Sequence, residues 1–181
     1  MDLRKVLVGD RTALRPVEPE DKSFILSHLG DEGVYQHIVN REPIATLEEA
    51  EAYIDAHMGG DRQNRWVIEL LTSKQKIGTI GFYNLDRQNH TAGISYDLSR
   101  MYWHQGIMSE VLGIVIAYGL EDLGLNRIEA LVHLENLPAY YALRKKGFVA
   151  EGIIREAYYS HGKYHDHYLM SILQGQAKRR N

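Results

Sequence analysis

A predicted strand that leads directly into a long apolar helix constrains the fold of this chain more than any other feature. Residues 91–98 include β-branched and aromatic side chains and follow a polar turn, which is typical of a strand. From Ser109 to Leu123 the apolar residues recur at helical spacing, and Gly124 follows as a helix stop. The loop between the two elements contains Gly106. A chain with this arrangement is predicted to pack helices against a sheet.

The rest of the chain shows the same mixture of strand and helix patterns. Thr46 and Glu49 have the spacing of a capping box, and the helix predicted from Thr46 to Met58 stops at Gly59 and Gly60. The short polar connections between residues 66 and 98 predict an antiparallel meander. Further strands are predicted at 12–17, 66–71, 76–83, 127–133, 148–159 and 164–173, the last two joined by a turn at 161–163, and further helices at 19–28 and 136–147. The predicted fold class is therefore α+β with a central mixed sheet.

The composition is that of an ordinary soluble globular protein and excludes several kinds of chemistry. The 181 residues suffice for one domain. The chain has 21 Lys and Arg and 24 Asp and Glu, which gives a formal charge of -3. This overall charge gives no electrostatic reason to expect direct binding to nucleic acid. The absence of Cys excludes disulfides, iron–sulfur clusters, Cys-ligated zinc and Cys nucleophiles.

Hydrophobic patterning argues against a membrane location. The longest apolar stretch, residues 111–120, is about half of the roughly 20 residues that a membrane-spanning helix needs. The N-terminal residues lack the apolar run of a secretory signal. We therefore expect no membrane partner and a cytoplasmic location.

The loop before the long helix has the features of an anion-binding site. Backbone N–H groups from Gln105 to Ser109 would lack partners within the helix and would point along its axis. The helix dipole adds partial positive charge, so a pyrophosphate could bind there without lysines. The same residues also fit a plain strand-to-helix turn, because the loop has neither the Walker pattern nor the three-glycine dinucleotide pattern. A protein that binds another nucleotide at this helix is a further alternative.

A second strand-to-helix junction carries Asn136. The residues that follow keep a helical pattern until Gly147. An Asn at this junction can cap the helix, offer its amide to a ligand lying beside the strand, or do both.

Together these segments resemble the GCN5-related N-acetyltransferase (GNAT) superfamily, and most closely its RimJ/RimL-type ribosomal-protein N-terminal acetyltransferases. The resemblance spans nearly the whole chain, and the order and spacing of its motifs make it specific. The motifs are Arg11–Pro16 with Glu20 and Asp21, Ile77–Gly81, Ala92–Leu98, Tyr102–Glu110, Asn136, Lys146–Phe148, Glu151 with Gly152, and Gly162–Asp166.

The resemblance implies a three-layer fold with a central mixed, mostly antiparallel sheet whose fourth and fifth strands splay apart. These strands are residues 91–98 and 127–133. It also implies a single N-acetyltransferase (GNAT) domain over residues 1–181, with acetyl-CoA as cosubstrate. Pantetheine would insert between the splayed strands, with the pyrophosphate on the following helix N-terminus. By this resemblance, acetyl-CoA would contact three groups of residues. The backbone groups of Tyr96, Asp97 and Leu98 would lie along pantetheine, and Asn136 would lie beside the same arm. The pyrophosphate would be bound by Gln105, Gly106, Ile107, Met108 and Ser109.

The phosphate-binding loop departs from the family pattern at two positions. The pattern Gln/Arg-x-x-Gly-x-Gly/Ala falls on residues 101–106, so Met101 stands at its first position and His104 at its middle glycine. Only Gly106 is kept. A positive φ at His104 would cost energy, so either the turn is ordinary there or the loop is altered. The His104 imidazole would then lie on the surface, or it would face a phosphate or the substrate.

The usual proton donors are also replaced. Many members carry Tyr seven residues after the Asn, where this chain has Leu143, and RimL-like members carry Ser three residues after it, where this chain has Ala139. Tyr140 lies three residues before Leu143, on nearly the same helix face, and is therefore the candidate general acid for the CoA thiolate. Tyr140 fits a packing aromatic equally well. The missing donors also favour an alternative, a noncatalytic module that binds CoA.

No general base is evident, which favours an α-amine acceptor. An α-amine with a pKa of about 8 is partly neutral near neutral pH, whereas a Lys side chain near ~10.4 needs help from a base. The RimL-type Glu of a later strand is replaced by Tyr158, which shares a strand face with Glu156. The preferred acceptor is the N-terminal amine of a protein, by resemblance a ribosomal one. A polyamine, an aminoglycoside or another small amine is the alternative.

Histidines and tyrosines gather in the C-terminal strands. His165 and His167 lie two apart, near His161, and could be read as metal ligands. Histidine pairs on strands are common and no helical ligand motif accompanies this one, so no metal is expected. Four tyrosines in these strands have three possible roles: they could line a peptide groove, form the interface of a homo-oligomer or pack within the sheet. They are Tyr158, Tyr159, Tyr164 and Tyr168.

Overall fold

A central sheet organises the fold, which the computed structural model describes for residues 2–36, 38, 42–58, 62–160 and 162–177. Within these residues the strands are β1 (Leu7–Val8), β2 (Thr12–Pro16), β3 (Trp66–Leu70), β4 (Lys76–Asp86), β5 (Thr91–Leu98), β6 (Arg127–His133), β7 (Val149–Ser160) and β8 (Lys163–Leu173). Their order in space is β1-β2-β3-β4-β5-β6-β8-β7. The neighbours pair antiparallel except β5 and β6, which are parallel. The predicted mixed, mostly antiparallel sheet is confirmed.

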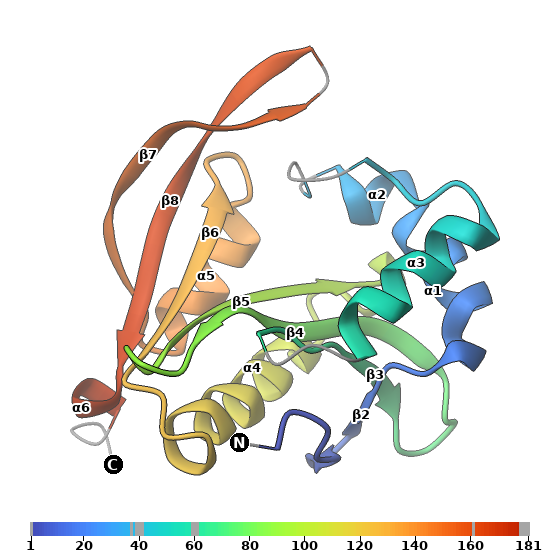
Figure 1. Cartoon of the computed structure of the whole chain (residues 1–181), viewed down its shortest axis with the longest axis horizontal. Helices are drawn as coiled ribbons and strands as arrows, with labels where there is room; N and C mark the ends of the chain where they lie inside the picture. Colours follow the sequence, from blue (N-terminus) through green and yellow to red (C-terminus); the bar gives the residue numbers. More distant parts are fainter. Residues whose placement is uncertain (1, 37, 39–41, 59–61, 161, 178–181) are drawn as a thin grey trace.

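β5 and β6 separate soon after they begin. They pair only from Thr91 with Arg127 to Gly93 with Glu129. Beyond these residues β5 follows β4 and β6 follows β8, so a gap widens between them (Figure 1). This gap is the splay that was predicted between the fourth and fifth strands. The predicted fourth and fifth strands are β5 and β6 because the sequence did not predict β1. That strand has two residues, which is too short to show an alternation of apolar and polar side chains.

Helices cover both faces of the sheet and complete the three predicted layers (Figure 1). Helices α1 and α3 lie over one face, and α4 and α5 lie over the other. The helical segments are η1 (Pro19–Asp21), α1 (Lys22–Leu29), α2 (Glu32–Tyr35), α3 (Leu47–Met58), η2 (Arg100–Tyr102), α4 (Ile107–Ala117), the π turn η3 (Tyr118–Asp122), α5 (Leu137–Lys145) and α6 (Gln174–Ala177).

The core is divided by the sheet. The larger apolar cluster packs α4 and α5 against the sheet and includes Trp66, Phe82 and Leu143, each almost fully buried. The smaller cluster joins α1 and α3 to the opposite face through residues such as Ile25 and Ile54. Burial of this apolar area is the main force that holds the layers together. The sheet that carries the gap between β5 and β6 is therefore supported from both sides.

The predicted capping box at the start of α3 forms. The Glu49 amide donates to Thr46 Oγ1 at 3.2 Å, and the Glu49 carboxylate accepts from the Thr46 amide at 3.3 Å and the Ala45 amide at 2.7 Å. These contacts satisfy backbone donors that the helix itself leaves unpaired. The predicted stop at Gly59 and Gly60, and His161 of the predicted turn, lie outside the described residues.

The long helix predicted from Ser109 to Leu123 begins two residues earlier than expected. α4 starts at Ile107 and ends at Ala117, and the π turn η3 continues the same chain direction. The π turn is closed by a bond from the Leu123 amide to the Tyr118 carbonyl. The earlier start adds residues 107 and 108 to the first helical turn, whose amides have no acceptor within the helix.

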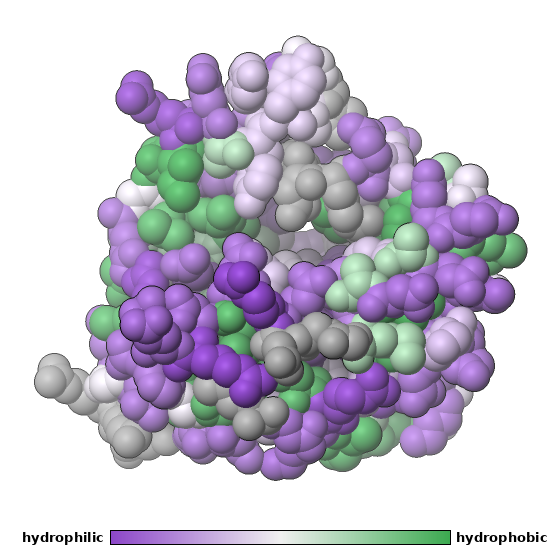
Figure 2. Space-filling view, in the orientation of Figure 1, coloured by the Kyte–Doolittle hydropathy of each residue, from purple (hydrophilic) through white to green (hydrophobic). Residues whose placement is uncertain are grey.

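The β7–β8 hairpin projects beyond the rest of the sheet (Figure 1). Most of the surface seen in Figure 2 is hydrophilic. Among the described residues, none of the helices combines the length and the apolar character needed to span a bilayer.

Candidate functional site

A cavity of about 760 Å³ opens where β5 and β6 separate. This volume is in the range of small-molecule sites, which is roughly 300–1,000 Å³. Many of its lining residues come from β5, β6, α5 and the first turn of α4, and α2, α3, β4, β7 and β8 also contribute. The lining includes Ile94–Leu98, Tyr102–His104, Gly106–Ser109, Ala130–His133, Asn136, Pro138, Ala139, Ala142 and Leu143. The gap in the sheet is thus a binding-sized space with a helix N-terminus at its edge.

The first turn of α4 lies on the cavity wall, where the sequence predicted an anion site. Gly106, Ile107, Met108 and Ser109 all line the cavity. Gly106 caps the helix with φ of 76°, a left-handed conformation that glycine adopts without steric cost. The first intrahelical bond runs from the Glu110 amide to the Gly106 carbonyl, so the preceding amides are left for a ligand. Together with the helix dipole they favour a phosphate.

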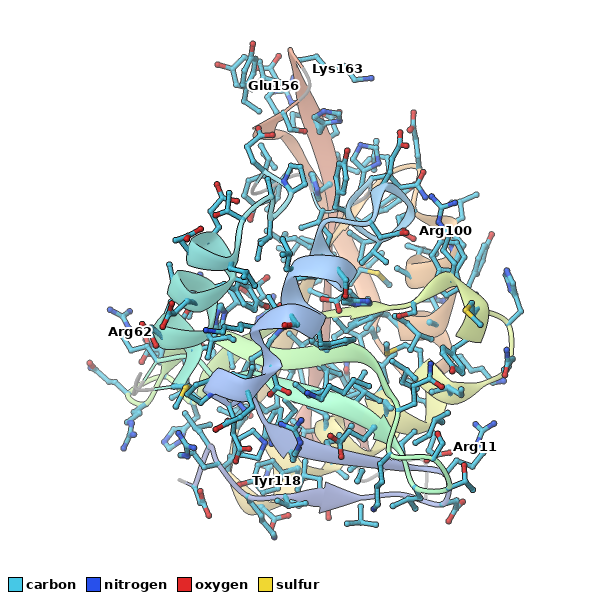
Figure 3. All side chains as sticks on the ribbon, turned by 90° about the vertical axis from the view of Figure 1, so that its right-hand side faces the viewer. Arg11, Arg62, Arg100, Tyr118, Glu156 and Lys163 are labelled. Atoms are coloured by element: carbon cyan, nitrogen blue, oxygen red, sulfur yellow. The ribbon has the colours of Figure 1, made fainter. Side chains whose placement is uncertain are left out.

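Gln105 supports the loop instead of facing the cavity with its side chain. Its amide nitrogen donates to the Met101 carbonyl at 2.7 Å, and its own carbonyl accepts from Arg11 Nη1 at 2.9 Å. Arg11 also pairs with Glu110, with Nε 2.9 Å from Oε2. Arg11 and Arg100 lie on the same side of the molecule (Figure 3). Arg11 therefore ties the loop to the start of β2, and its charge is paired with that of Glu110.

His104 occupies the conformation that the sequence analysis left open. Its φ is 59°, in the left-handed region, although it stands where the related pattern has glycine. The loop therefore keeps the backbone turn of the glycine pattern. A left-handed backbone conformation is less stable for a non-glycine residue by about 1–2 kcal/mol, so the turn is strained at His104. His104 lines the cavity with an exposed side chain.

Replacing His104 by Gly is expected to stabilise the protein. The relieved strain is partly offset by the larger freedom of glycine in the unfolded chain, which leaves about 0.5–1 kcal/mol. A thermal unfolding curve should show a midpoint higher by about 1–4 °C. A lower midpoint would mean that the turn is not strained, and weaker binding of CoA by a stable His104→Gly variant would assign the imidazole to the ligand.

The edge of β5 that faces the gap offers backbone groups at two of the three expected residues, Tyr96 and Leu98, because Asp97 is paired with Thr79 of β4 and turns its backbone groups to that strand. The Ser99 amide donates to Ile77 of β4 at 2.8 Å. Because backbone groups alternate between the two edges of a strand, those of Leu98 and Tyr96 point the other way, into the gap. The Leu98 carbonyl is already taken by Trp103 Nε1 at 2.7 Å. The free donor at this end of the strand is therefore an amide.

Asp97 has a structural role that the sequence did not predict. Its carboxylate is buried and accepts from Arg65 Nη2 at 2.6 Å, from His28 Nε2 at 2.7 Å and from the Thr79 amide at 2.9 Å. Burial alone would raise the pKa of Asp97, but the charge of Arg65 and the hydrogen bonds from His28 and Thr79 hold this pKa well below its usual range. This network fastens β5 to β3, β4 and α1.

Asn136 performs the capping function and also lines the cavity. Its Oδ1 accepts from the Ala139 amide at 3.2 Å, which leaves its NH₂ group as a donor for a ligand. Tyr96 crosses from β5 to the same helix turn, where its hydroxyl lies 3.3 Å from the Ala139 carbonyl. Both roles considered for Asn136 are compatible with this geometry.

Tyr140 lies away from the cavity wall. Its ring is 4.9 Å from that of Tyr168 on β8 and 5.4 Å from that of Tyr141, measured between centroids. The cavity is lined instead by its neighbour Ala139 and by Leu143. The general-acid role of Tyr140 remains a prediction, and it would require the ring to turn towards the gap.

Aromatic and histidine rings line the part of the cavity away from α4. Its described lining includes Tyr53, Tyr83, His133, Tyr158 and His167. Among the described lining residues, the charged side chains are those of Arg65 and Asp97, which pair with each other. The sequence analysis did not single out Tyr83 or His133, because only the sheet brings β4, β6, β7 and β8 together.

The C-terminal histidines contact one another directly. His133 Nε2 lies 2.9 Å from His165 Nδ1, and the rings of His133 and His167 are 5.5 Å apart. A bond between two ring nitrogens uses the atoms that would bind a metal. In the part of the chain that the structure describes, no group of three or more His, Cys, Asp or Glu is arranged to hold a metal ion. Glu156 lies near the hairpin tip, apart from the cavity lining (Figure 3).

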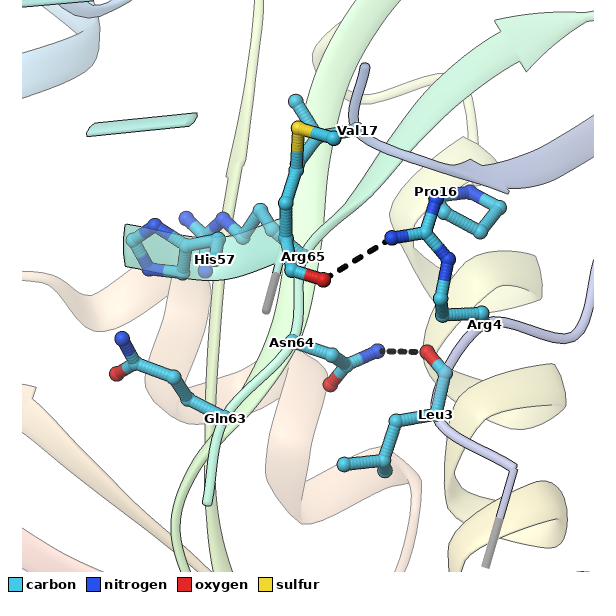
Figure 4. Close-up of a pocket in the computed structure, with 9 residues that line it drawn as sticks. Leu3, Arg4, Pro16, Val17, His57, Gln63, Asn64 and Arg65 are labelled. Atoms are coloured by element: carbon cyan, nitrogen blue, oxygen red, sulfur yellow. Dashed lines mark hydrogen bonds between the residues drawn. The ribbon is translucent and has the colours of Figure 1, made fainter. Parts of the chain in front are cut away.

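A second cavity has a volume of about 20 Å³, which is room for one water molecule. Arg4 Nη1 donates to the Met58 carbonyl and Asn64 Nδ2 donates to the Leu3 carbonyl at its edge (Figure 4). These bonds fasten the N-terminal segment to the end of α3 and to the segment that precedes β3. The cavity is too small for a substrate.

Comparison with known proteins agrees with the site geometry. Residues 11–149 match a family described as an acetyltransferase (GNAT) domain. An uncharacterized N-acetyltransferase, p20 of Bacillus licheniformis, is 34% identical over 174 residues, which cover 94% of this chain and 97% of the relative. Spermidine N(1)-acetyltransferase of Escherichia coli (strain K12) is 25% identical over 163 residues, which cover 90% of this chain and 86% of the relative.

A solved structure with the same fold contains CoA. Spermidine N-acetyltransferase from Vibrio cholerae, in complex with CoA and spermine, superposes with a TM-score of 0.84 at 24% identity. The superposition covers 93% of this chain and 98% of that one. At this identity the likeness shows the fold.

Proposed function

The chain belongs to the GNAT acetyltransferase family and is an acetyl-CoA-dependent N-acetyltransferase, and on this premise we propose that it acetylates the N-terminal α-amine of a protein. We also propose that the whole chain forms one such domain. The observation that carries the acceptor assignment is the charge of the cavity. Its described lining contains no carboxylate beyond Asp97, which Arg65 neutralises at 2.6 Å.

Acetyl-CoA fits the gap between β5 and β6 in this proposal. The amides of residues 106–109 would bind the pyrophosphate, and the Asn136 NH₂ group would bind the pantetheine arm. Support comes from the cavity, which joins both groups in one space of about 760 Å³. The amide of Leu98 or Tyr96 would donate to the thioester carbonyl and stabilise the negative charge that develops on its oxygen.

The charge of the cavity favours an α-amine over a polyamine. Spermidine carries several positive charges, and a site for it needs carboxylates that are not already paired. The spermidine acetyltransferase relative, at 25% identity over 90% of this chain, keeps a polyamine as the second candidate. An α-amine needs less electrostatic help because part of it is already neutral at a pH below its pKa of about 8.

A panel of amines tests the proposed acceptor. We expect release of free CoA from acetyl-CoA with short peptides that have a free N-terminus. The matched control is the same peptide with a blocked N-terminus and one internal Lys, which should react at least about 100-fold more slowly because a Lys amine has a pKa near ~10.4. Spermidine and an aminoglycoside complete the panel. Preference for spermidine would replace the proposed acceptor by a polyamine, and CoA binding without transfer to any amine would indicate a noncatalytic module.

A further inference from the structure

His167 on β8 lines the cavity, and one of its ring nitrogens is hydrogen-bonded. Its Nδ1 lies 3.2 Å from the His165 carbonyl oxygen, which can only accept a hydrogen bond. Nδ1 must therefore carry the proton, and in the neutral ring Nε2 has a free lone pair. The side chain is 3% exposed and lines the cavity. The ring thus brings a buried basic nitrogen to the cavity wall.

A directed chain of hydrogen bonds joins the rings of His133 and His165, which neighbour His167. The Glu135 amide donates to His133 Nδ1 at 3.2 Å, so His133 Nε2 carries the proton that it shares with His165 Nδ1. His165 Nε2 then donates to the Ser160 carbonyl at 3.0 Å. One ring proton on each histidine is enough to make these three hydrogen bonds.

The surroundings of His167 favour its neutral form. Burial lowers the pKa of His167 below its ordinary value and outweighs the largest opposing effect, which is the hydrogen bond with the His165 carbonyl. Positive charge on His133 or His165 would lower this pKa further, and the charge of Asp166 opposes it. From β7 the ring of Tyr158 packs edge-on at 5.0 Å. The groups that face His167 are thus His133 of β6, Tyr158 of β7, and His165 and Asp166 of its own strand. A base must be unprotonated to act, and this environment keeps it so near neutral pH.

We propose that Nε2 of His167 is the general base that accepts the proton of the acceptor amine during acetyl transfer. This inference rests on the proposed function. Its geometric basis is the forced tautomer, the burial and the position of the ring on the cavity wall beside Tyr158. The family-like Glu of the later strand is replaced by Tyr158, and His167 supplies a basic group next to that position.

Acetyl transfer with His167 as the base moves one acetyl group to the amine and one proton to the imidazole. The amine nitrogen bonds to the thioester carbonyl carbon, and the carbonyl π electrons move to oxygen. One N–H proton of the resulting ammonium passes to His167 Nε2. The oxygen electrons reform the C=O bond while the C–S bond breaks, and CoA leaves as the thiolate with that electron pair. The products are the acetylated amine, the CoA thiolate and protonated His167, which returns its proton to the thiolate or to water.

A His167→Asn variant tests the proposal. The Asn Nδ2 can still donate to the His165 carbonyl, as Nδ1 does now, but it offers no basic nitrogen. At pH 7 we expect kcat/KM to fall about 100- to 10,000-fold, with unchanged affinity for CoA. The wild-type rate should fall at low pH as His167 takes up a proton, so its acid limb lies below ~6.5. In the variant this limb should disappear, and the rate should follow the pKa of the amine alone.

His90→Asn is the matched control. His90 is exposed in the turn between β4 and β5, and Asn tolerates its left-handed backbone. This variant should keep the wild-type rate and pH profile. A His167→Asn enzyme with the wild-type kcat/KM and acid limb would overturn the proposal. So would a loss of rate accompanied by weaker CoA binding and an unchanged pH profile, because that result describes a structural role.

The outcome for the base is distinguishable from the outcome for the acceptor. If the wild type prefers spermidine, the acceptor assignment fails, and the two variants are compared with spermidine under the same criteria. If the wild type binds CoA but transfers acetyl to no amine, both the proposed function and the proposed base are overturned.

Discussion

Alanine in place of Asp97 is expected to destabilise the protein by about 3–5 kcal/mol, a large part of the roughly 5–15 kcal/mol available to a folded domain. The substitution leaves the Arg65 guanidinium buried without the carboxylate that now lies 2.6 Å away. It also removes the acceptor for His28 and for the Thr79 amide. Unfolding in urea, followed by circular dichroism, measures the change.

Asp55→Ala is the matched control for Asp97→Ala. Asp55 is exposed on α3, so its loss should change the unfolding free energy by no more than about 0.5 kcal/mol. The lowered pKa of Asp97 means that its contribution is present above the ordinary value of ~3.9 and is lost as the pH falls through the lower folded value. The difference between wild type and Asp97→Ala should therefore shrink in acid. An unfolding midpoint unaffected by Asp97→Ala at pH 7 would show that the network does not hold β5.

Glutamate in place of Ser109 is expected to abolish most CoA binding without unfolding the protein. Ser109 is in the first turn of α4 and lines the cavity. A carboxylate there would lie close to the bound pyrophosphate, and two like charges about 5 Å apart repel by about 3 kcal/mol at an effective dielectric constant near 20. This energy corresponds to roughly 100-fold weaker binding. Titration calorimetry with CoA measures the affinity.

Ser109→Gln separates charge from size in this experiment. Gln has the shape of Glu without the charge, so it should weaken binding much less than Glu does. A negative charge at the start of a helix is itself favourable by about 0.3–1 kcal/mol, so the Ser109→Glu protein should be at least as stable as the wild type. Equal loss of CoA affinity in both variants would argue against a pyrophosphate at this helix.

Local patterns were sufficient to predict the elements that form the cofactor side of the cavity. Residues 91–98 and 127–133 form strands with the predicted bounds, because their composition and flanking turns determine them locally. Gly106 and Asn136 could be predicted for the same reason, since each stands at a junction whose backbone geometry requires such a residue.

The rest of the site depends on contacts between distant segments, which local patterns do not contain. Asp97 meets Arg65 and His28 only after three layers assemble. His133 and His167 become neighbours through the pairing of β6 with β8. Helical spacing placed Tyr140 near Leu143, but its ring packs on Tyr168, a residue of β8 that a helical wheel does not include.

Hydrogen–deuterium exchange with and without CoA tests most directly whether the gap between β5 and β6 is the acetyl-CoA site. The amides of residues 106–109 lack acceptors within α4, and those of Tyr96 and Leu98 face the gap. CoA should slow exchange at these amides and leave the distant turn between β4 and β5 unchanged. The account would be contradicted if CoA binds and protects another surface while exchange at residues 106–109 stays unchanged.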